Sequence, residues 1–277
     1  RHQQHQQLLG ISPSGGAPTL LVEERDAAWL NLDQSVPKWL DDGSFLWTTE
    51  RRGAWQLERR AADGTLISEL TSPDFGFQSL QAVNEEAGFA WVRASVDPTQ
   101  THLWRVPLGS SDAGPETDPE PVTTRPGTHG VSAQGDLWVH HYTNPASQTS
   151  WTLRRGQEER LGEIQSRAVE PPWPANVELA VVGERGLHAS IVRPHDFDPE
   201  RRYPVLVSVY GGPHVTVVRL ASRRYLMHQW YANHGFIVVS IDGRGTPSRG
   251  RTWERAIRDD FITLPLEDQV DGLQALG

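Results

Sequence analysis

A tyrosine stands where an apolar strand meets a glycine-rich turn, in the segment 205-VLVSVYGGPHV-215. The strand ends at Tyr210, and Gly211 and Gly212 follow directly. Paired glycines let the backbone pass where side chains would clash. A phenol hydroxyl at such a joint can donate to the oxyanion that develops during acyl transfer. Tyr210 is therefore a candidate for oxyanion stabilisation, with Gly211 and Gly212 as its supporting loop. A core tyrosine with a hydrogen-bonded hydroxyl is the competing interpretation, and the residue types leave both open.

Motifs for other catalytic chemistries are missing from the sequence. A Gly-x-Ser-x-Gly nucleophile elbow does not occur, since Ser248 precedes Gly250 but Thr246 stands where the first glycine is needed. There is also no Gly-x-x-x-x-Gly-Lys phosphate loop and no His-Glu-x-x-His zinc helix. The absence of cysteine excludes a thiolate nucleophile, a disulfide framework and a cysteine metal site.

The remaining polar residues suggest neither a metal site nor a triad. The sequence has 11 histidines, but no compact trio of them accompanies a carboxylate. His140 and His141 adjoin on an expected strand, so their side chains point to opposite faces. Asp242 resembles a triad acid, but in hydrolase folds that acid follows the nucleophile along the chain. The segment 242–250 is interpreted as a turn fixed by Arg244, in which positive φ is allowed by Gly243, Gly245 and Gly250.

The elements that must position Tyr210 have an α/β pattern. The runs 205–209 and 236–241 are almost continuously apolar, which predicts strands buried on both faces of a parallel sheet. Between them, apolar residues at helical spacing predict a helix over about 220–234, which Gly235 ends. These three elements form a β-α-β unit. The preceding segment 177–194 is expected to be an antiparallel hairpin around a glycine turn.

The last segment, 264-LPLEDQVDGLQALG-277, has the pattern of an amphipathic helix. Pro265 and the acids Glu267 and Asp268 are expected in its first turn, where they suit a helix N-terminus. Its apolar stripe is expected to contain Leu266, Val270, Leu273 and Leu276.

The first 165 or so residues repeat one plan. Each copy has a turn, then an apolar-aromatic strand, then a second strand that carries tryptophan. The lead tryptophans Trp47, Trp91 and Trp138 recur at intervals of about 45 residues, a period typical of β-propeller blades. A half blade is expected over 7–24, with its turn from Pro13 to Gly16. We expect the tryptophans to pack between neighbouring sheets, with a carbohydrate-binding surface as the alternative.

This repeat predicts a partial β-propeller over 1–165, followed by a proline-stiffened linker over 166–176. About three and a half blades cannot close a ring, because propellers have about four to eight. We therefore expect further blades on the N-terminal side. The segment 109-GSSDAGPETDPEP-121 is acidic and rich in proline and glycine, which predicts a disordered loop within one blade.

Composition excludes two classes of partner. The chain has 277 residues and a net charge of −9, and its arginine pairs are scattered, so we expect no nucleic acid. No apolar run approaches the ~18–20 residues that span a bilayer, so we expect no membrane partner. The chain opens with Arg1 and its single methionine is Met227, which is not a natural translation start. Localisation is therefore left open, and a bacterial cytoplasm or periplasm fits equally.

Four motifs together resemble the prolyl oligopeptidase family of serine peptidases. The Asp-Gly-Arg-Gly form at 242–245 is typical of the dipeptidyl peptidase IV branch, whereas acylaminoacyl-peptidase relatives more often show Asn-Tyr-Arg-Gly. The segment 47-WTTERRGAW-55 and the blade period also resemble that family's propeller. The four motifs are 203-YPVLVSVYGGPHV-215, 235-GFIVVSIDGRGTPSRG-250, 254-ERAIRDDF-261 and 267-EDQVDGL-273.

The resemblance implies closing propeller blades followed by the N-terminal part of an α/β-hydrolase catalytic domain over 177–277. It implies a serine exopeptidase that releases dipeptides with proline or alanine second, by acyl-enzyme chemistry and without a cofactor. By this match Tyr210 stabilises the oxyanion. The family's Ser/Asp/His triad and its acidic motif for the substrate's amino terminus have no counterpart in the sequence. We therefore expect the chain alone to be inactive and the rest of the propeller and hydrolase domain to accompany it. Homodimers are common in the resembling family.

Two other interpretations stay open. One is a catalytically inactive scaffold whose propeller and hydrolase-like part bind a partner. The other keeps the enzyme but makes it an oligopeptidase or an acylaminoacyl peptidase of the same family.

Overall fold

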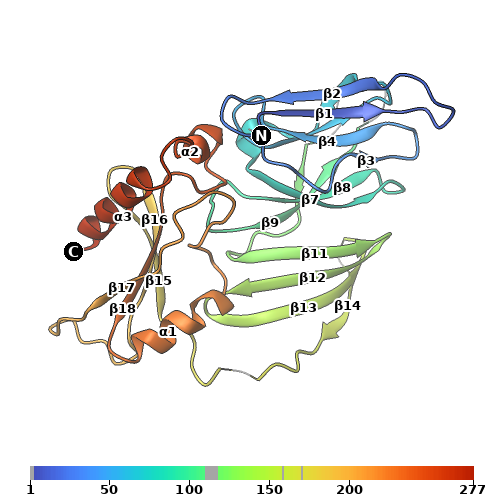
Figure 1. The fold of residues 1–277 in the computed structure, drawn as a ribbon. Helices are drawn as coiled ribbons and strands as arrows, with labels where there is room; N and C mark the ends of the chain where they lie inside the picture. The colour runs from blue at the N-terminus through green and yellow to red at the C-terminus, as the bar shows by residue number, and fades with distance from the viewer. Residues whose placement is uncertain (1–2, 110–117, 158, 170) are drawn as a thin grey trace. The chain divides into compact units, whose positions relative to one another are not determined.

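The computed structural model divides into two compact units (Figure 1). One comprises residues 1–96 and 103–122, and the other 97–102 and 123–277. The domain boundaries expected from the sequence stay a prediction. The residues that the structure describes are 3–109, 118–157, 159–169 and 171–277. Most of the loop predicted to be disordered, 109–121, and one residue of the predicted linker lie outside them. Within these described ranges, no helix is long and apolar enough to cross a membrane.

The first unit contains a hairpin and two four-stranded antiparallel sheets. The hairpin pairs β1 (His5–Gly10) with β2 (Thr19–Arg25), which is the predicted half blade. The next sheet has the order β3-β4-β5-β6, with strands Lys38–Trp39, Phe45–Thr49, Gln56–Arg60 and Leu66–Glu69. The other has the order β10-β9-β8-β7, with β7 to β10 at Phe77–Asn84, Phe89–Ala94, His102–Pro107 and Glu120–Pro121.

Apolar side chains from both sheets share one core in this unit. Leu46 and Leu57 of one sheet and Val92 of the other are fully buried there. Burying such side chains contributes about 1.5–3 kcal/mol each relative to exposure. The lead tryptophans Trp47 and Trp91 are both 2% exposed. Trp47 packs with Val22 of the β1–β2 hairpin, whereas the ring contacts of Trp91 are with Phe89 and Arg105 of its own sheet.

The third repeat is a sheet of the second unit, and it too is an antiparallel meander. Its strands are β11 (Thr128–Gln134), β12 (Leu137–Asn144), β13 (Ser147–Arg155) and β14 (Glu159–Ile164), in that order. Trp138 is buried, and its indole nitrogen donates to the carbonyl of Gly156 at 2.8 Å. Each predicted repeat therefore folds as one four-stranded sheet, as a propeller blade does.

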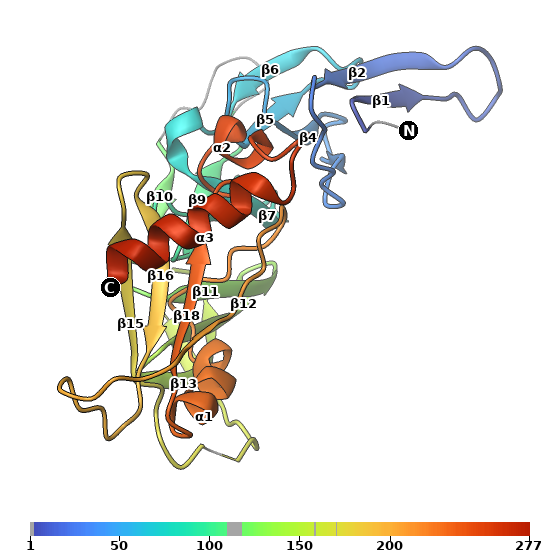
Figure 2. The same ribbon diagram turned by 60° about the vertical axis from the view of Figure 1, so that its left-hand side comes forward.

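A mixed sheet completes the second unit, in the order β15-β16-β18-β17. Only β17 and β18 are parallel. Helix α3 (Thr263–Leu276) contacts β15, β16 and β18, and α1 (Leu226–Ala232) contacts β16 and β18 (Figure 2). The strands are Val177–Val182, Leu187–Val192, Val205–Val207 and Ile237–Asp242 for β15 to β18, and the short helix α2 is Arg251–Arg255.

The period-two alternation of β18 explains how it faces two cores. Val239 and Ile241 pack in the core to which Leu273 of α3 contributes. Val238, which precedes Val239, points to the opposite face and packs with Ala232 of α1. The predicted hairpin, the β-α-β unit and the terminal helix are all present.

Strand β17 departs from the expectation. The sequence predicted a strand buried on both faces that reaches Tyr210, but β17 ends at Val207, and Val205 and Val209 are 51% and 57% exposed. The physical reason is its place at the edge of the sheet, where it pairs with β18 alone among the described strands.

Helix α3 corrects two further expectations. It begins at Thr263, so Glu267 and Asp268 lie beyond its first turn, which holds no acidic residue. Of the predicted apolar stripe, Leu273 and Leu276 pack against the core of the sheet, but Leu266 and Val270 are 58% and 42% exposed. The buried residues of the helix are Pro265, Asp268, Gln269 and Gly272.

Candidate functional site

Tyr210 lies just beyond the carboxyl end of β17. Its side chain belongs to a residue that is 45% exposed, so it is not the buried core tyrosine of the competing interpretation. The phenol hydroxyl donates a 2.5 Å hydrogen bond to the carbonyl of Pro213, three residues further along. That bond folds the turn back over the ring.

The two glycines of the turn have different roles. Gly211 has φ +65°, a left-handed conformation that L side chains seldom adopt. Gly212 has no such φ, but a Cβ there would meet the Tyr210 ring at 3.5 Å. His214 also adopts positive φ, at +78°. The turn is thus tightly curved around the tyrosine.

The loop that begins at Tyr210 has an exposed tip and a buried foot. Tyr210, His214 and Val215 are exposed, whereas residues 216–218 are all buried. The foot is held by Asp242 at the end of β18. Its carboxylate accepts the backbone N–H of Val217 at 2.9 Å to each oxygen, and that of Val218 at 2.8 Å.

Asp242 is 4% exposed. Burial raises the pKa of Asp242, while the N–H groups of Val217 and Val218 act in the opposite direction. From the sequence, Asp242 was not expected to be a triad acid, and no other role was predicted for it. Its position at the end of an apolar strand could have indicated this role, because a carboxylate that is buried there needs hydrogen-bond donors.

Beyond its foot, the loop runs to the β11–β14 sheet. Leu220 donates its N–H to the carbonyl of Thr99 at 2.8 Å, and its own carbonyl accepts from the Thr128 hydroxyl at 3.1 Å. Ser222 and Thr143 are joined through their hydroxyls at 2.9 Å. The loop is therefore fixed at its far end as well.

The turn after Asp242 is fixed as the sequence predicted, through Arg244. Asp268 of α3 is fully buried and accepts the Arg244 backbone N–H at 2.6 Å and the guanidinium Nη2 at 2.9 Å. Its hydrogen bonds raise the pKa of Arg244. Gly245 and Gly250 have positive φ, as expected. Gly243 does not, and its constraint is space: a Cβ there would lie 2.7 Å from Asp268.

Several histidines gather on the β11–β12 face. His129 Nδ1 and His140 Nε2 are 2.9 Å apart and their ring centroids are 5.1 Å apart. The His102 ring also stacks with His129, at 5.4 Å. Burial lowers the pKa of His129 and that of His140 to about 4. His141 instead packs on Trp151, so the adjacent histidines do face opposite ways. Among the described residues, no group of three or more His, Asp or Glu could hold a metal ion.

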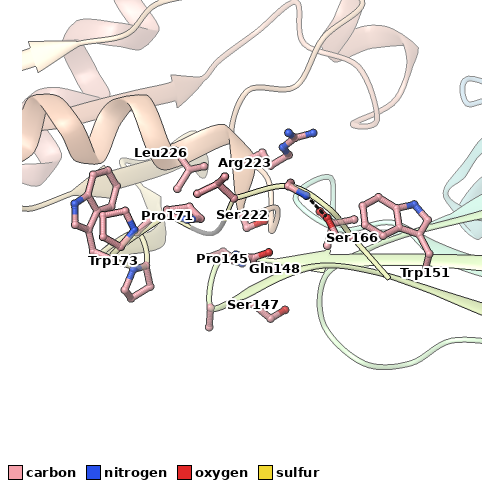
Figure 3. Close-up of a pocket in the computed structure, with 17 residues that line it drawn as sticks. Pro145, Ser147, Gln148, Trp151, Ser166, Pro171, Trp173, Ser222, Arg223 and Leu226 are labelled. Atoms are coloured by element: carbon pink, nitrogen blue, oxygen red, sulfur yellow. Dashed lines mark hydrogen bonds between the residues drawn. The ribbon is translucent and has the colours of Figure 1, made fainter. Parts of the chain in front are cut away.

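A cavity of about 340 Å³ opens in the second unit, between the β12–β13 turn, the segment 166–175 and the start of α1 (Figure 3). Trp151, Trp173 and several prolines line it, and Arg223 is its charged residue. Neither Tyr210 nor Asp242 reaches it. Because its lining holds none of the candidate site residues, we do not assign the chemistry to this cavity.

Comparison with known families matches both parts of the chain. Residues 1–149 match the family described as the dipeptidyl peptidase IV N-terminal region. Residues 222–277 match the prolyl oligopeptidase family.

Individual relatives agree with these matches. A probable dipeptidyl-aminopeptidase B of Coccidioides posadasii is 26% identical over 232 residues, which cover 78% of this chain and 24% of that protein. Mouse dipeptidyl peptidase 8 is 37% identical over 92 residues, or 32% of this chain and 10% of that protein. The chain thus spans about a quarter or less of these curated relatives.

The fold is that of a solved peptidase structure. Dipeptidyl peptidase 4 of Porphyromonas gingivalis superposes with a TM-score of 0.86 at 21% identity, over 99% of this chain and 40% of that one. This likeness confirms the predicted fold class, propeller blades followed by the first part of an α/β-hydrolase domain.

Proposed function

Because the chain belongs to the prolyl oligopeptidase family of serine peptidases, in its dipeptidyl peptidase IV branch, we propose that it is part of a serine exopeptidase. The substrate is a peptide, from whose N-terminus dipeptides with proline or alanine second are released through an acyl-enzyme. The sequence contains no nucleophile elbow, so the serine must come from elsewhere in the protein and the 277-residue chain alone is inactive.

The observation that carries this proposal is the half-exposed phenol of Tyr210 at the end of a parallel strand. In α/β-hydrolases the loop after the third strand supplies a donor to the tetrahedral intermediate. The Tyr210 hydroxyl would exchange its bond to the Pro213 carbonyl for one to the oxyanion. An oxyanion is the stronger acceptor, because hydrogen bonds to charged groups are shorter and about twice as strong as neutral ones.

Tyr210→Phe in the full-length protein tests this role. Removal of one oxyanion donor costs about 10²–10³ in kcat, close to 3 kcal/mol. We expect that loss on a Gly-Pro chromogenic substrate, with KM nearly unchanged, because the bond is made in the transition state. Tyr203→Phe is the matched control, since its hydroxyl accepts the Asp198 N–H on the preceding loop. An undiminished kcat in Tyr210→Phe would rule out the role.

The main alternative is an inactive scaffold, which the missing elbow favours if the full-length protein also lacks a serine nucleophile. Labelling of that protein by a serine-reactive phosphonate distinguishes the two. An oligopeptidase or acylaminoacyl peptidase would instead cleave blocked or longer peptides in preference to free N-terminal dipeptides.

A further inference from the structure

We propose that Asp242 is a positioning residue for Tyr210: its carboxylate fixes the foot of the loop that holds the phenol at the site. This inference rests on the proposed function of Tyr210. It assigns to a residue of β18 an effect on the reaction that is exerted through the loop, without contact with substrate.

The sheet brings the two residues to one edge. Val207 of β17 pairs with Val239 of β18 in parallel register. Asp242 is the last residue of β18, three residues after Val239, and Tyr210 follows Val207 by three residues, beyond the end of β17. Both chains therefore leave the sheet at the same carboxyl edge, where sites in α/β folds form.

The connection between them is short and defined. Tyr210 is hydrogen-bonded to Pro213, and the Asp242 carboxylate holds Val217 and Val218 by three contacts of 2.8–2.9 Å. Only residues 214–216 separate the two held points. His214 is already in a left-handed conformation, so this stretch has little freedom to absorb a shift of the foot.

Burial makes the carboxylate hard to replace. Val217 and Val218 are 7% and 0% exposed, so water does not substitute for Asp242 as their acceptor. An amide in its place has only one acceptor oxygen and turns an NH₂ group toward backbone donors. Asp242→Asn should therefore displace the foot while keeping nearly the same volume.

A carboxylate that only stabilised the fold would look similar in the structure, so the test is a double-mutant cycle. The variants are Asp242→Asn, Tyr210→Phe and their combination, in the full-length protein, with kcat and KM measured on a Gly-Pro chromogenic substrate. We expect Asp242→Asn to lower kcat at least about tenfold with little change in KM. In the Tyr210→Phe background, Asp242→Asn should lower kcat by less than about twofold, because the hydroxyl that Asp242 positions is absent.

Asp268→Asn is the matched control. Asp268 is also a buried aspartate that accepts a backbone N–H, but from Arg244 rather than from the Tyr210 loop. Any loss of kcat that it causes should be the same in both Tyr210 backgrounds. If Asp242→Asn does not fold, Asp242→Glu keeps the charge while moving the oxygens by one methylene, and the same cycle applies.

The outcomes separate the two proposals. If Tyr210→Phe is slow but Asp242→Asn costs the same factor with and without the hydroxyl, the positioning role is wrong and the oxyanion role stands. An Asp242→Asn variant with full kcat has the same meaning. If Tyr210→Phe is fully active, both proposals fall together.

Discussion

At the residue scale, the candidate site contains two buried aspartates whose carboxylates are compensated by different partners. Desolvation disfavours the ionised form of a buried carboxylate, unless donors and opposite charges compensate it. Asp242 relies on backbone N–H groups, and burial still raises its pKa. Asp268 has the Arg244 guanidinium in addition. Both lie next to the Asp-Gly-Arg-Gly turn, which therefore joins β18 to the tyrosine loop on one side and to α3 on the other.

Residue types indicated part of this candidate site. A strand end followed by two glycines made Tyr210 a candidate, the family resemblance gave it the oxyanion role, which stays a prediction, and Gly211 does have a positive φ. The partners of Asp242 were not predictable, because Val217 and Val218 are apolar residues that contribute only their backbone. The type of a side chain does not indicate which acceptor the backbone N–H of the same residue will bind.

Gly245 offers a test of the turn. Its φ is +97°, and a Cβ would lie 2.4 Å from Ile257 Cδ1. Gly235 has a similar φ of +94°, but nothing lies within 4 Å of its missing Cβ. We expect Gly235→Ala to cost about 1–2 kcal/mol for the left-handed conformation, and Gly245→Ala about 1–3 kcal/mol more for overpacking. Thermal unfolding of the full-length variants measures the difference, and equal midpoints would contradict the packing contribution.

At the element scale, helix α3 shows where pattern reasoning reaches its limit. Its existence and nearly its ends followed from the sequence, but its orientation did not. Periodicity favoured Leu266 and Val270 as the buried face, whereas Asp268 and Gly272 are buried. The reasons lie outside the helix: Arg244 pairs with Asp268, and Gly272 lets Ile241 approach.

The Arg244–Asp268 pair should dominate the stability of this helix contact. Removal of one partner from a buried pair leaves an uncompensated charge, which costs about 3–5 kcal/mol. Arg244 is partly exposed at 19%, so we expect Arg244→Leu to lie near the lower end of that range. Arg185 serves as the control, because its side chain is 41% exposed and lies 3.9 Å from Asp268. Arg185→Leu should lower the free energy of unfolding by less than about 1 kcal/mol. Similar destabilisation by the two variants would contradict this assignment.

The histidine stack of the β11–β14 sheet predicts a pH dependence. Burial holds the pKa of His129 and of His140 at about 4, below the usual 6.5 of histidine. As pH falls from 6.5 toward 4, the unfolded chain binds protons that the folded chain does not, so stability is full above pH 6.5 and is lost through this window. His102, His141, Arg125 and Arg154 add positive charge around the pair.

Denaturant unfolding at several pH values between 7 and 4 measures this loss. The double variant His129→Asn, His140→Gln removes both titrating rings and should lose less stability across the window than the parent protein does. Carboxylates titrate in both proteins, so the difference between the two curves isolates the stack. Parallel curves would show that these histidines do not contribute.

At the scale of the whole molecule, the sequence repeat was the strongest predictor. A period of about 45 residues, marked by buried tryptophans, specified the blade sheets because each blade must bury its faces against neighbours. The change to continuous apolar strands specified the α/β part. The exposure of β17 depended on which strand lies beside it, and a strand's own residues do not reveal its neighbour.

That exposed edge leads to a last prediction, for the 277-residue chain by itself. Val205 of β17 and Val209, just beyond its end, are more than half exposed, and within the described residues the strand has a partner on one side only. Unpaired N–H and C=O groups beside apolar side chains form a template for association. We propose that in the full-length protein a further strand of the hydrolase domain pairs with this edge. Without it, the chain should form oligomers that grow with concentration in the micromolar range.

Sedimentation velocity of the chain at increasing concentration measures this association. Val205→Lys places a charge on the edge strand, as natural edges do, and should shift the chain toward monomer. Val96→Lys is a matched control, since Val96 is 77% exposed but lies outside the strands. A parent chain that sediments as a monomer and unfolds cooperatively would show that the edge is already protected.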